Sequence, residues 1–206
     1  MPADPPPDFF VKPVLTGDRV VLRPARPDDI PALLDALADP EVLRLTGSVH
    51  DSVQDAETVL GPDEADSLRR YYASRNEQPD RLDLVVIDKA SRRCVGEVVL
   101  NEWDEGNRSC NFRTLIGPAG RDRGLGTEAL RLIAGYGFEQ LGLHRISLEV
   151  YAFNPRARHV YEKVGFIAEG VLRDALRYED GWVDATVMSI LDHEWARHRG
   201  HPPIPG

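Results

Sequence analysis

Two kinds of hydrophobic pattern divide the chain into strands and helices. Apolar runs of strand length, continuous or alternating, occur at 19–23, 82–87, 94–100, 109–116, 145–151, 166–172 and 182–191. Helical spacing or good helix-forming residues mark 28–38, 55–60, 63–75, 124–141 and 155–164. Turn residues separate most of these segments. The pattern predicts a mixed α/β protein.

The order of the segments predicts how the strands pair. The three strands between residues 82 and 116 follow one another through short turns, which favours an antiparallel meander. The strand 109–116, the helix after it and the strand 145–151 form a crossover, which makes those two strands parallel. We therefore expect a mixed sheet covered by helices. The expected domain spans residues 15–192, between an extended Pro-rich arm (1–14) and a loose polar tail (193–206).

A glycine-containing loop, Arg121-Asp122-Arg123-Gly124-Leu125-Gly126-Thr127, joins the strand 109–116 to the next helix. The first N–H groups of a helix have no partner within the helix and attract anions. Glycine lets the backbone approach a ligand closely. The loop therefore predicts an anion site suited to a diphosphate.

Composition narrows the function. The 206 residues carry a net charge of −9, which argues against a nucleic-acid binder and favours a cationic partner. No apolar run reaches the roughly 18 residues of a membrane span, and no secretory signal is expected. The two cysteines, Cys94 and Cys110, lie in strand-like segments and suggest buried, reduced thiols. We expect a cytoplasmic protein without a metal site.

Two motifs in this context resemble the GNAT acyltransferase superfamily. They are Arg121-x-x-Gly124-x-Gly126 and Asn154-x-x-Ala157-x-x-x-Tyr161-x-x-x-Gly165-Phe166, and the resemblance extends over residues 17–192. Residues 15–24 and 180–184 are similar to the branch that acetylates the N-termini of ribosomal proteins. Relatives in that branch also modify antibiotics, polyamines and other small amines.

The resemblance implies a sheet whose central parallel strands splay apart, with helices on both faces, and acetyl-CoA as co-substrate. Backbone N–H groups of Asp122, Arg123, Gly124, Leu125, Gly126 and Thr127 would hold its diphosphate. The guanidinium of Arg121 or Arg123 would add a charge-assisted contact. Main-chain groups of Leu115 and Ile116 would bind the pantetheine arm as an added strand would. Asn154 would contact the coenzyme, cap its helix, or do both, and Arg158 would reach a phosphate or coat the surface.

Catalysis would use Tyr161 as the general acid that protonates the departing thiolate. Some relatives carry a glutamate as base on the strand before the loop, but residues 109–115 contain no acid. We choose Glu149 as the base, ahead of Glu97, Glu102 and Asp184, because its strand adjoins the expected site.

The function implied is acyl transfer, by default of acetyl, to a primary amine on a protein N-terminus or a small molecule. The acidic chain favours a cationic acceptor such as a peptide N-terminus, an aminoglycoside or a polyamine, and a homodimer is allowed. The alternative is a non-catalytic domain that binds acyl-CoA. A nucleotide-binding domain fits less well, because position 127 is Thr127 where a P-loop has lysine.

Overall fold

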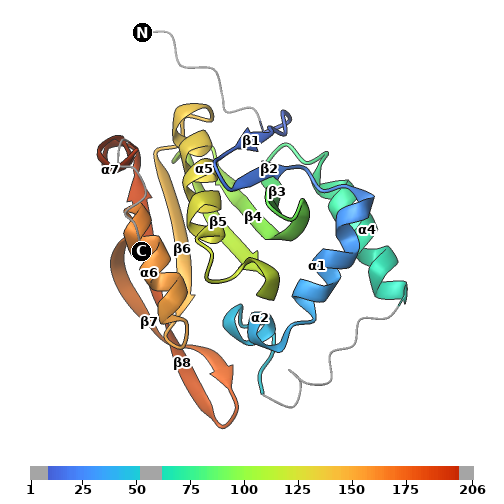
Figure 1. Ribbon diagram of the computed structural model, residues 1–206. Coiled ribbons are helices and arrows are strands. Elements are labelled where there is room, and N and C mark those ends of the chain that lie inside the picture. Colours follow the sequence, from blue (N-terminus) through green and yellow to red (C-terminus); the bar gives the residue numbers. More distant parts are fainter. Residues whose placement is uncertain (1–8, 52–61, 200–206) are drawn as a thin grey trace.

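The computed structural model describes residues 9–51 and 62–199, which form one eight-stranded sheet with helices on both faces (Figure 1). Its strands are β1 (Leu15–Thr16), β2 (Val20–Arg23), β3 (Leu82–Asp88), β4 (Arg93–Asp104), β5 (Ser109–Ile116), β6 (Arg145–Tyr151), β7 (Ile167–Tyr178) and β8 (Gly181–Leu191). The strand order is β1-β2-β3-β4-β5-β6-β8-β7. The β5–β6 pair is parallel and the other pairs are antiparallel, so the predicted mixed sheet is confirmed.

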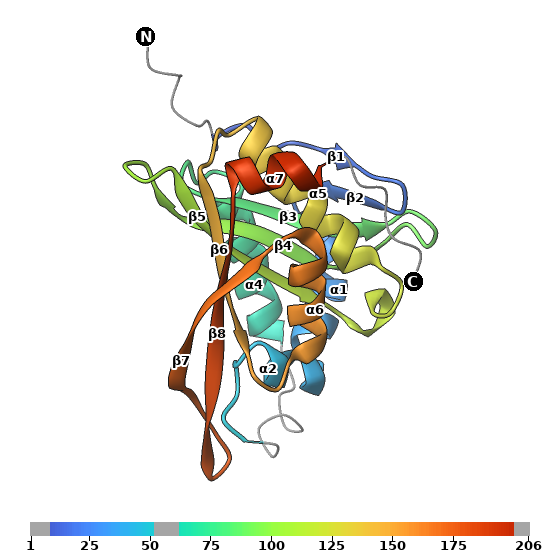
Figure 2. The same cartoon turned by 90° about the vertical axis from the view of Figure 1, so that its left-hand side faces the viewer.

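Helices cover the two faces of the sheet in separate groups. The helices are α1 (Ile30–Leu37), α2 (Pro40–Leu45), α4 (Pro62–Arg75), α5 (Leu125–Glu139), α6 (Pro155–Val164) and α7 (Asp192–His198), with short 3-10 turns at Pro27–Asp29 and Pro118–Gly120. The helices α5, α6 and α7 lie on one face, and α1 and α4 lie on the other (Figures 1 and 2). The second group, with α2 beside it, defines what we call the α4 side.

Alternation along the strands supplies a separate core to each face. On β4, Val98 and Leu100 enter the large core under α5, together with Phe112 of β5. The α4 side has a smaller core that includes Val85 of β3 and Tyr72 of α4. Glu97 pairs with Val85 across the β3–β4 ladder, so its side chain lies on the α4 side.

The parallel strands β5 and β6 are paired over only part of their length. Their register runs from Ser109 opposite Arg145 to Asn111 opposite Ser147. Beyond these residues β5 continues to Ile116 without pairing to β6. The strands therefore separate near the middle of the sheet, as the resemblance implies.

The structure confirms the end of the helix expected at 28–38, corrects one other expectation and does not reach a third. The helix α1 ends at Leu37 and Pro40 begins α2, which Asp39 caps by accepting from the N–H of Val42 at 2.9 Å. The tail expected to be loose forms α7 over residues 192–198, because Trp195 is buried against Phe138, with ring centroids 5.9 Å apart. The helix expected at 55–60 lies outside the described residues.

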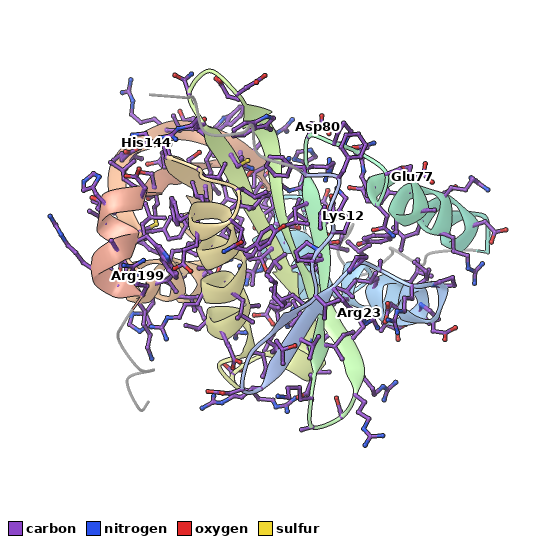
Figure 3. The ribbon with its side chains drawn as sticks, turned by 90° about the horizontal axis from the view of Figure 1, so that it is seen from above. Lys12, Arg23, Glu77, Asp80, His144 and Arg199 are labelled. Atoms are coloured by element: carbon purple, nitrogen blue, oxygen red, sulfur yellow. The ribbon has the colours of Figure 1, made fainter. Side chains whose placement is uncertain are left out.

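The described part of the N-terminal arm lies against the body of the protein. Phe9 is 1% exposed and packs on Trp103, with ring centroids 5.4 Å apart. The Lys12 Nζ donates to the carbonyl oxygens of Gln78 and Arg81 at 2.7 and 2.6 Å. Viewed from above, Lys12 lies on the same side of the molecule as Glu77 and Asp80, far from His144 (Figure 3). Phe9 is thus held against β4, and Lys12 is held beside the residues that follow α4.

Candidate active site

A cavity of about 690 Å³ opens where β5 and β6 separate. Its lining includes residues from both faces of the sheet: Leu130 and Tyr161 from the α5 and α6 side, and Leu68 and Tyr72 from α4. The β5 residues from Asn111 to Ile116 also line it. The cavity therefore connects the two faces of the molecule through the sheet.

The glycine-containing loop lines this cavity at the start of α5. Gly124 precedes the helix with φ of 73°, a left-handed conformation that suits glycine, and it provides no side-chain cap. A Cβ atom on Gly126 would meet only an ordinary contact, 3.4 Å from Cγ1 of Ile116, so space remains above the backbone. Uncapped N–H groups with open space before them form an anion site. The loop residues that line the cavity are Arg121, Asp122, Gly124, Leu125, Gly126 and Thr127.

The side chain of Arg121 is engaged within the protein. One guanidinium nitrogen, Nη2, lies 2.6 Å from Oδ1 of Asp39, and Nη1 forms a very short contact with Glu41. The Nε donates to the carbonyl oxygen of Ile116 at 3.2 Å. Arg121 therefore joins the loop, the end of β5 and the start of α2, where the sequence suggested a contact with a phosphate.

Arg123 also has internal partners, and it does not line the cavity. Its Nη1 lies 3.0 Å from Oδ2 of Asp88 and donates to the carbonyl of Ala119 at 3.1 Å. Hydrogen bonds from Ser91, and then from Arg123, lower the pKa of Asp88 to about 2. Arg123 therefore links the loop to the end of β3.

On α6, only one of the two residues that the sequence suggested for coenzyme binding lines the cavity. Asn154 lines the cavity and caps the helix, its Oδ1 accepting from the N–H of Ala157 at 3.0 Å. Arg158 does not line the cavity and pairs with Glu162 at 2.9 Å. The cavity instead has Arg156 in its lining, 3.5 Å from Oδ1 of Asp122. Sequence reasoning missed Arg156, although its place two residues after the cap turns it toward the loop.

Tyr161 lines the cavity from the other end of α6. It is 8% exposed and packs against Phe112 and Phe166, with ring centroids 6.2 and 6.0 Å away. Burial raises the pKa of Tyr161 to about 12. Within the described part of the chain its hydroxyl group has no hydrogen-bond partner, so a neutral donor is available to a ligand.

The candidate bases fall into two groups. Glu149 lies on β6, two residues after Ser147, and lines the cavity from its α4 side. Glu97 and Glu102 on β4 also line it. Asp184 does not, and its Oδ1 accepts from the N–H of Asp174 in the β7–β8 hairpin at 2.9 Å.

The helix α4 forms part of one wall of the cavity. Leu68, Tyr71 and Tyr72 line the cavity. The spacing of these residues, three and four apart, places them on one face of a helix, and that was the available signal. The hydroxyl of Tyr72 donates to Oε2 of Glu97 at 2.6 Å, a pair that sequence reasoning did not find.

The described residues contain no group of three or more His, Cys, Asp and Glu side chains arranged to hold a metal ion. None of their helices combines the length and the apolar content needed to cross a lipid bilayer. Cys94 and Cys110 are buried free thiols, and burial raises their pKa values to about 11 and about 12.

Comparison with known proteins identifies the family to which the chain belongs. Residues 19–167 match the model of the acetyltransferase (GNAT) domain. The spermidine N(1)-acetyltransferase of Escherichia coli K12 is 33% identical over 147 residues, covering 65% of this chain and 79% of that protein. A putative ribosomal N-acetyltransferase of Bacillus subtilis, YdaF, is 32% identical over 100 residues, covering 48% of this chain and 55% of that protein.

Solved structures give the same result. The structure of spermidine N-acetyltransferase from Vibrio cholerae, in complex with CoA and spermine, matches with a TM-score of 0.73 and 25% identity. The match covers 87% of this chain and 99% of that one. Family model, sequence relatives and fold all indicate the same family. The chain therefore belongs to the GNAT acetyltransferase family and is an N-acetyltransferase that takes its acetyl group from acetyl-CoA.

Proposed function

We propose that the acceptor of this enzyme is a cationic small-molecule amine, and that linear polyamines are the acceptor class that fits best. This proposal depends on the charged side chains that β4, β5 and β6 contribute to the cavity lining: three of these are carboxylates, Glu97, Glu102 and Glu149, and one is a guanidinium, Arg113. Carboxylates in a partly desolvated cavity favour cationic ligands. The relatives named as spermidine acetyltransferases support the same class.

In this proposal acetyl-CoA binds from the face of α5 and α6. The loop from Asp122 to Thr127 holds the diphosphate, and the unpaired edge of β5 at Leu115 and Ile116 binds the pantetheine arm. We assign the additional phosphate contact to Arg156 in place of Arg158, because Arg156 lines the cavity. The thioester then lies in the gap between β5 and β6.

The acceptor amine approaches from the α4 side and attacks the carbonyl carbon of the thioester. A C–N bond forms and the C–S bond breaks, so the sulfur leaves with the electron pair. Tyr161 donates its hydroxyl proton to that sulfur, and Glu149 takes the proton lost by the amine, directly or through a water molecule. The products are the N-acetylated amine and free CoA.

The proposal is tested by measuring thiol release from acetyl-CoA with a panel of amines. The panel holds spermidine, spermine, an aminoglycoside, and peptides that begin with Ala or Ser. We expect the highest kcat/KM with the polyamines. Turnover confined to the peptides would overturn the polyamine class and favour a protein N-terminus, the other acceptor class that the sequence suggested.

We further propose that the enzyme is a homodimer formed through the β7–β8 hairpin. The strand β7 is an edge of the sheet, and the hairpin exposes large apolar side chains, including Val171 and Trp182. An exposed apolar edge strand invites pairing with a second chain. A cytoplasmic location stays a prediction, based on the thiols Cys94 and Cys110, which persist in reducing compartments.

A further inference from the structure

The Tyr72–Glu97 pair stands on the α4 side of the cavity, between α4 and the sheet. The Tyr72 hydroxyl donates to Oε2 of Glu97 at 2.6 Å, and Tyr72 is only 4% exposed. The hydroxyl of Thr114 donates to the main-chain carbonyl of Glu97 at 2.9 Å. Both the side chain and the backbone of Glu97 are therefore held in position, and the residue keeps part of its surface toward the cavity.

Glu97 forms no salt bridge with any arginine, lysine or histidine among the described residues, and Arg81 is paired with Asp83 at 2.6 Å. Burial raises the pKa of Glu97, the hydrogen bond from Tyr72 opposes this, the negative charge of Asp83 raises the pKa further, and the charges of Arg113 and Arg81 lower it. A desolvated carboxylate without a cation in contact is costly. An ammonium group bound to it in the cavity would reduce that cost.

The position of Glu97 differs from that of the reacting groups. Glu97 lies on β4 at the level of Leu115, on one side of β5, and Glu149 lies on β6, on the other side. Neighbouring strands are about 4.8 Å apart, so the backbones of β4 and β6 are roughly 10 Å apart, and farther where β5 and β6 separate. The two carboxylates project from strands on opposite sides of β5, so a chain with two ammonium groups can contact both.

We propose that Glu97, oriented by Tyr72, binds a second ammonium group of the acceptor while the first reacts beside Glu149. This inference rests on the proposed function and defines the substrate further: a linear amine with at least two cationic nitrogens several bonds apart. The ammonium group donates hydrogen bonds to the free oxygen of the Glu97 carboxylate, and Tyr72 keeps the other oxygen. Such charge-assisted bonds are the stronger ones in proteins.

The test uses a matched pair of acceptors: a linear α,ω-diamine about as long as spermidine, and the amino-alcohol of the same chain length. The variants are Glu97→Gln, which keeps the shape and can still accept from Tyr72, and Tyr72→Phe. Glu105→Gln is the control, because Glu105 is exposed in the turn after β4, outside the cavity lining, and its loss changes the net charge equally.

We expect Glu97→Gln to lower the ratio of kcat/KM for the diamine over the amino-alcohol by about 10- to 100-fold, mainly through the KM of the diamine. Tyr72→Phe should lower it by several-fold, and Glu105→Gln should leave it unchanged. If Glu97→Gln lowers kcat/KM equally for both acceptors, or lowers it for neither, the subsite would be overturned.

A calorimetric measurement of diamine binding distinguishes failure of this inference from failure of the proposed function. Wild-type enzyme that binds the diamine through Glu97 but does not acetylate it would refute the function and support the subsite. If the wild-type enzyme acetylates the diamine and Glu97→Gln leaves the ratio of kcat/KM for the diamine over the amino-alcohol unchanged, the function would be supported and the subsite refuted. Absence of both binding and turnover would refute both.

Discussion

At the scale of single residues, the surroundings of Tyr161 control its protonation. The aromatic rings of Phe112 and Phe166 exclude water from the phenol, and its pKa rises to about 12. At neutral pH the hydroxyl group therefore keeps its proton, as an acid for the departing thiolate must. The same apolar packing limits how far the ring can move from the cavity.

Replacing Tyr161 with Phe should lower kcat by about 100-fold or more, because the thiolate then leaves without a proton donor. The KM for acetyl-CoA should change little, since the ring and its packing stay. Steady-state thiol release measures both. Tyr136→Phe, on α5 outside the cavity lining, is the control. Undiminished turnover in Tyr161→Phe would refute the role as acid.

Motif spacing predicted which residues would gather at the cavity better than it predicted what their side chains would bind. Tyr161 and Asn154 line the cavity, as expected from their motif. The partners of Arg121 could not be predicted, because Asp39 and Glu41 precede it by 82 and 80 positions. A guanidinium binds whichever carboxylates the fold brings to it, and local sequence does not contain that information.

At the scale of elements, the unit of strand, loop and helix around residues 109–141 could be predicted because its signals are local. The glycines indicate a loop, and the spacing of the apolar residues indicates a helix. The helix α7 could not be predicted in this way. The sequence after it is polar and Pro-rich and so resembles a tail. The helix is stabilised by the buried Trp195, which also donates from Nε1 to Glu139 of α5 at 3.0 Å.

The start of α5 can be tested with Gly126→Asp. A carboxylate in the first turn of a helix stabilises the helix, but here it would repel a bound diphosphate. We expect thermal stability to be unchanged or higher. We expect the affinity for coenzyme A to fall at least tenfold, which corresponds to about 1.4 kcal/mol of binding free energy. Calorimetric titration and thermal melting measure the two effects. Gly126→Asn is the neutral match, and an equal loss in both variants would indicate a steric cause.

At the scale of the whole molecule, the sheet was predictable in type but not in extent. Hydrophobic runs indicated a mixed sheet, and the crossover rule predicted the parallel pair. Local pattern does not determine where β5 and β6 separate, because that depends on packing from both faces. It also underestimated β7, which was expected at 166–172 and continues to Tyr178, since its pairing with β8 extends past the predicted end.

The β7–β8 hairpin projects from the rest of the molecule (Figure 2), and Trp182 on it is 62% exposed. We expect light scattering after size-exclusion chromatography to give twice the mass of the chain. Val171→Lys should shift the protein to a monomer, because a charge would be buried at the interface. Val14→Lys, at an exposed valine near β1, should not. A monomeric wild-type enzyme would refute the dimer.

The gap between β5 and β6 also bears on the kinetic order of the reaction. In the proposed arrangement the two substrates approach from opposite faces of the sheet and meet only at the thioester. Neither blocks the entrance of the other, so both can be bound at once. No acetylated enzyme needs to form, and CoA and the acetylated amine can depart by separate routes. The fold thus permits random binding and release in place of a compulsory sequence.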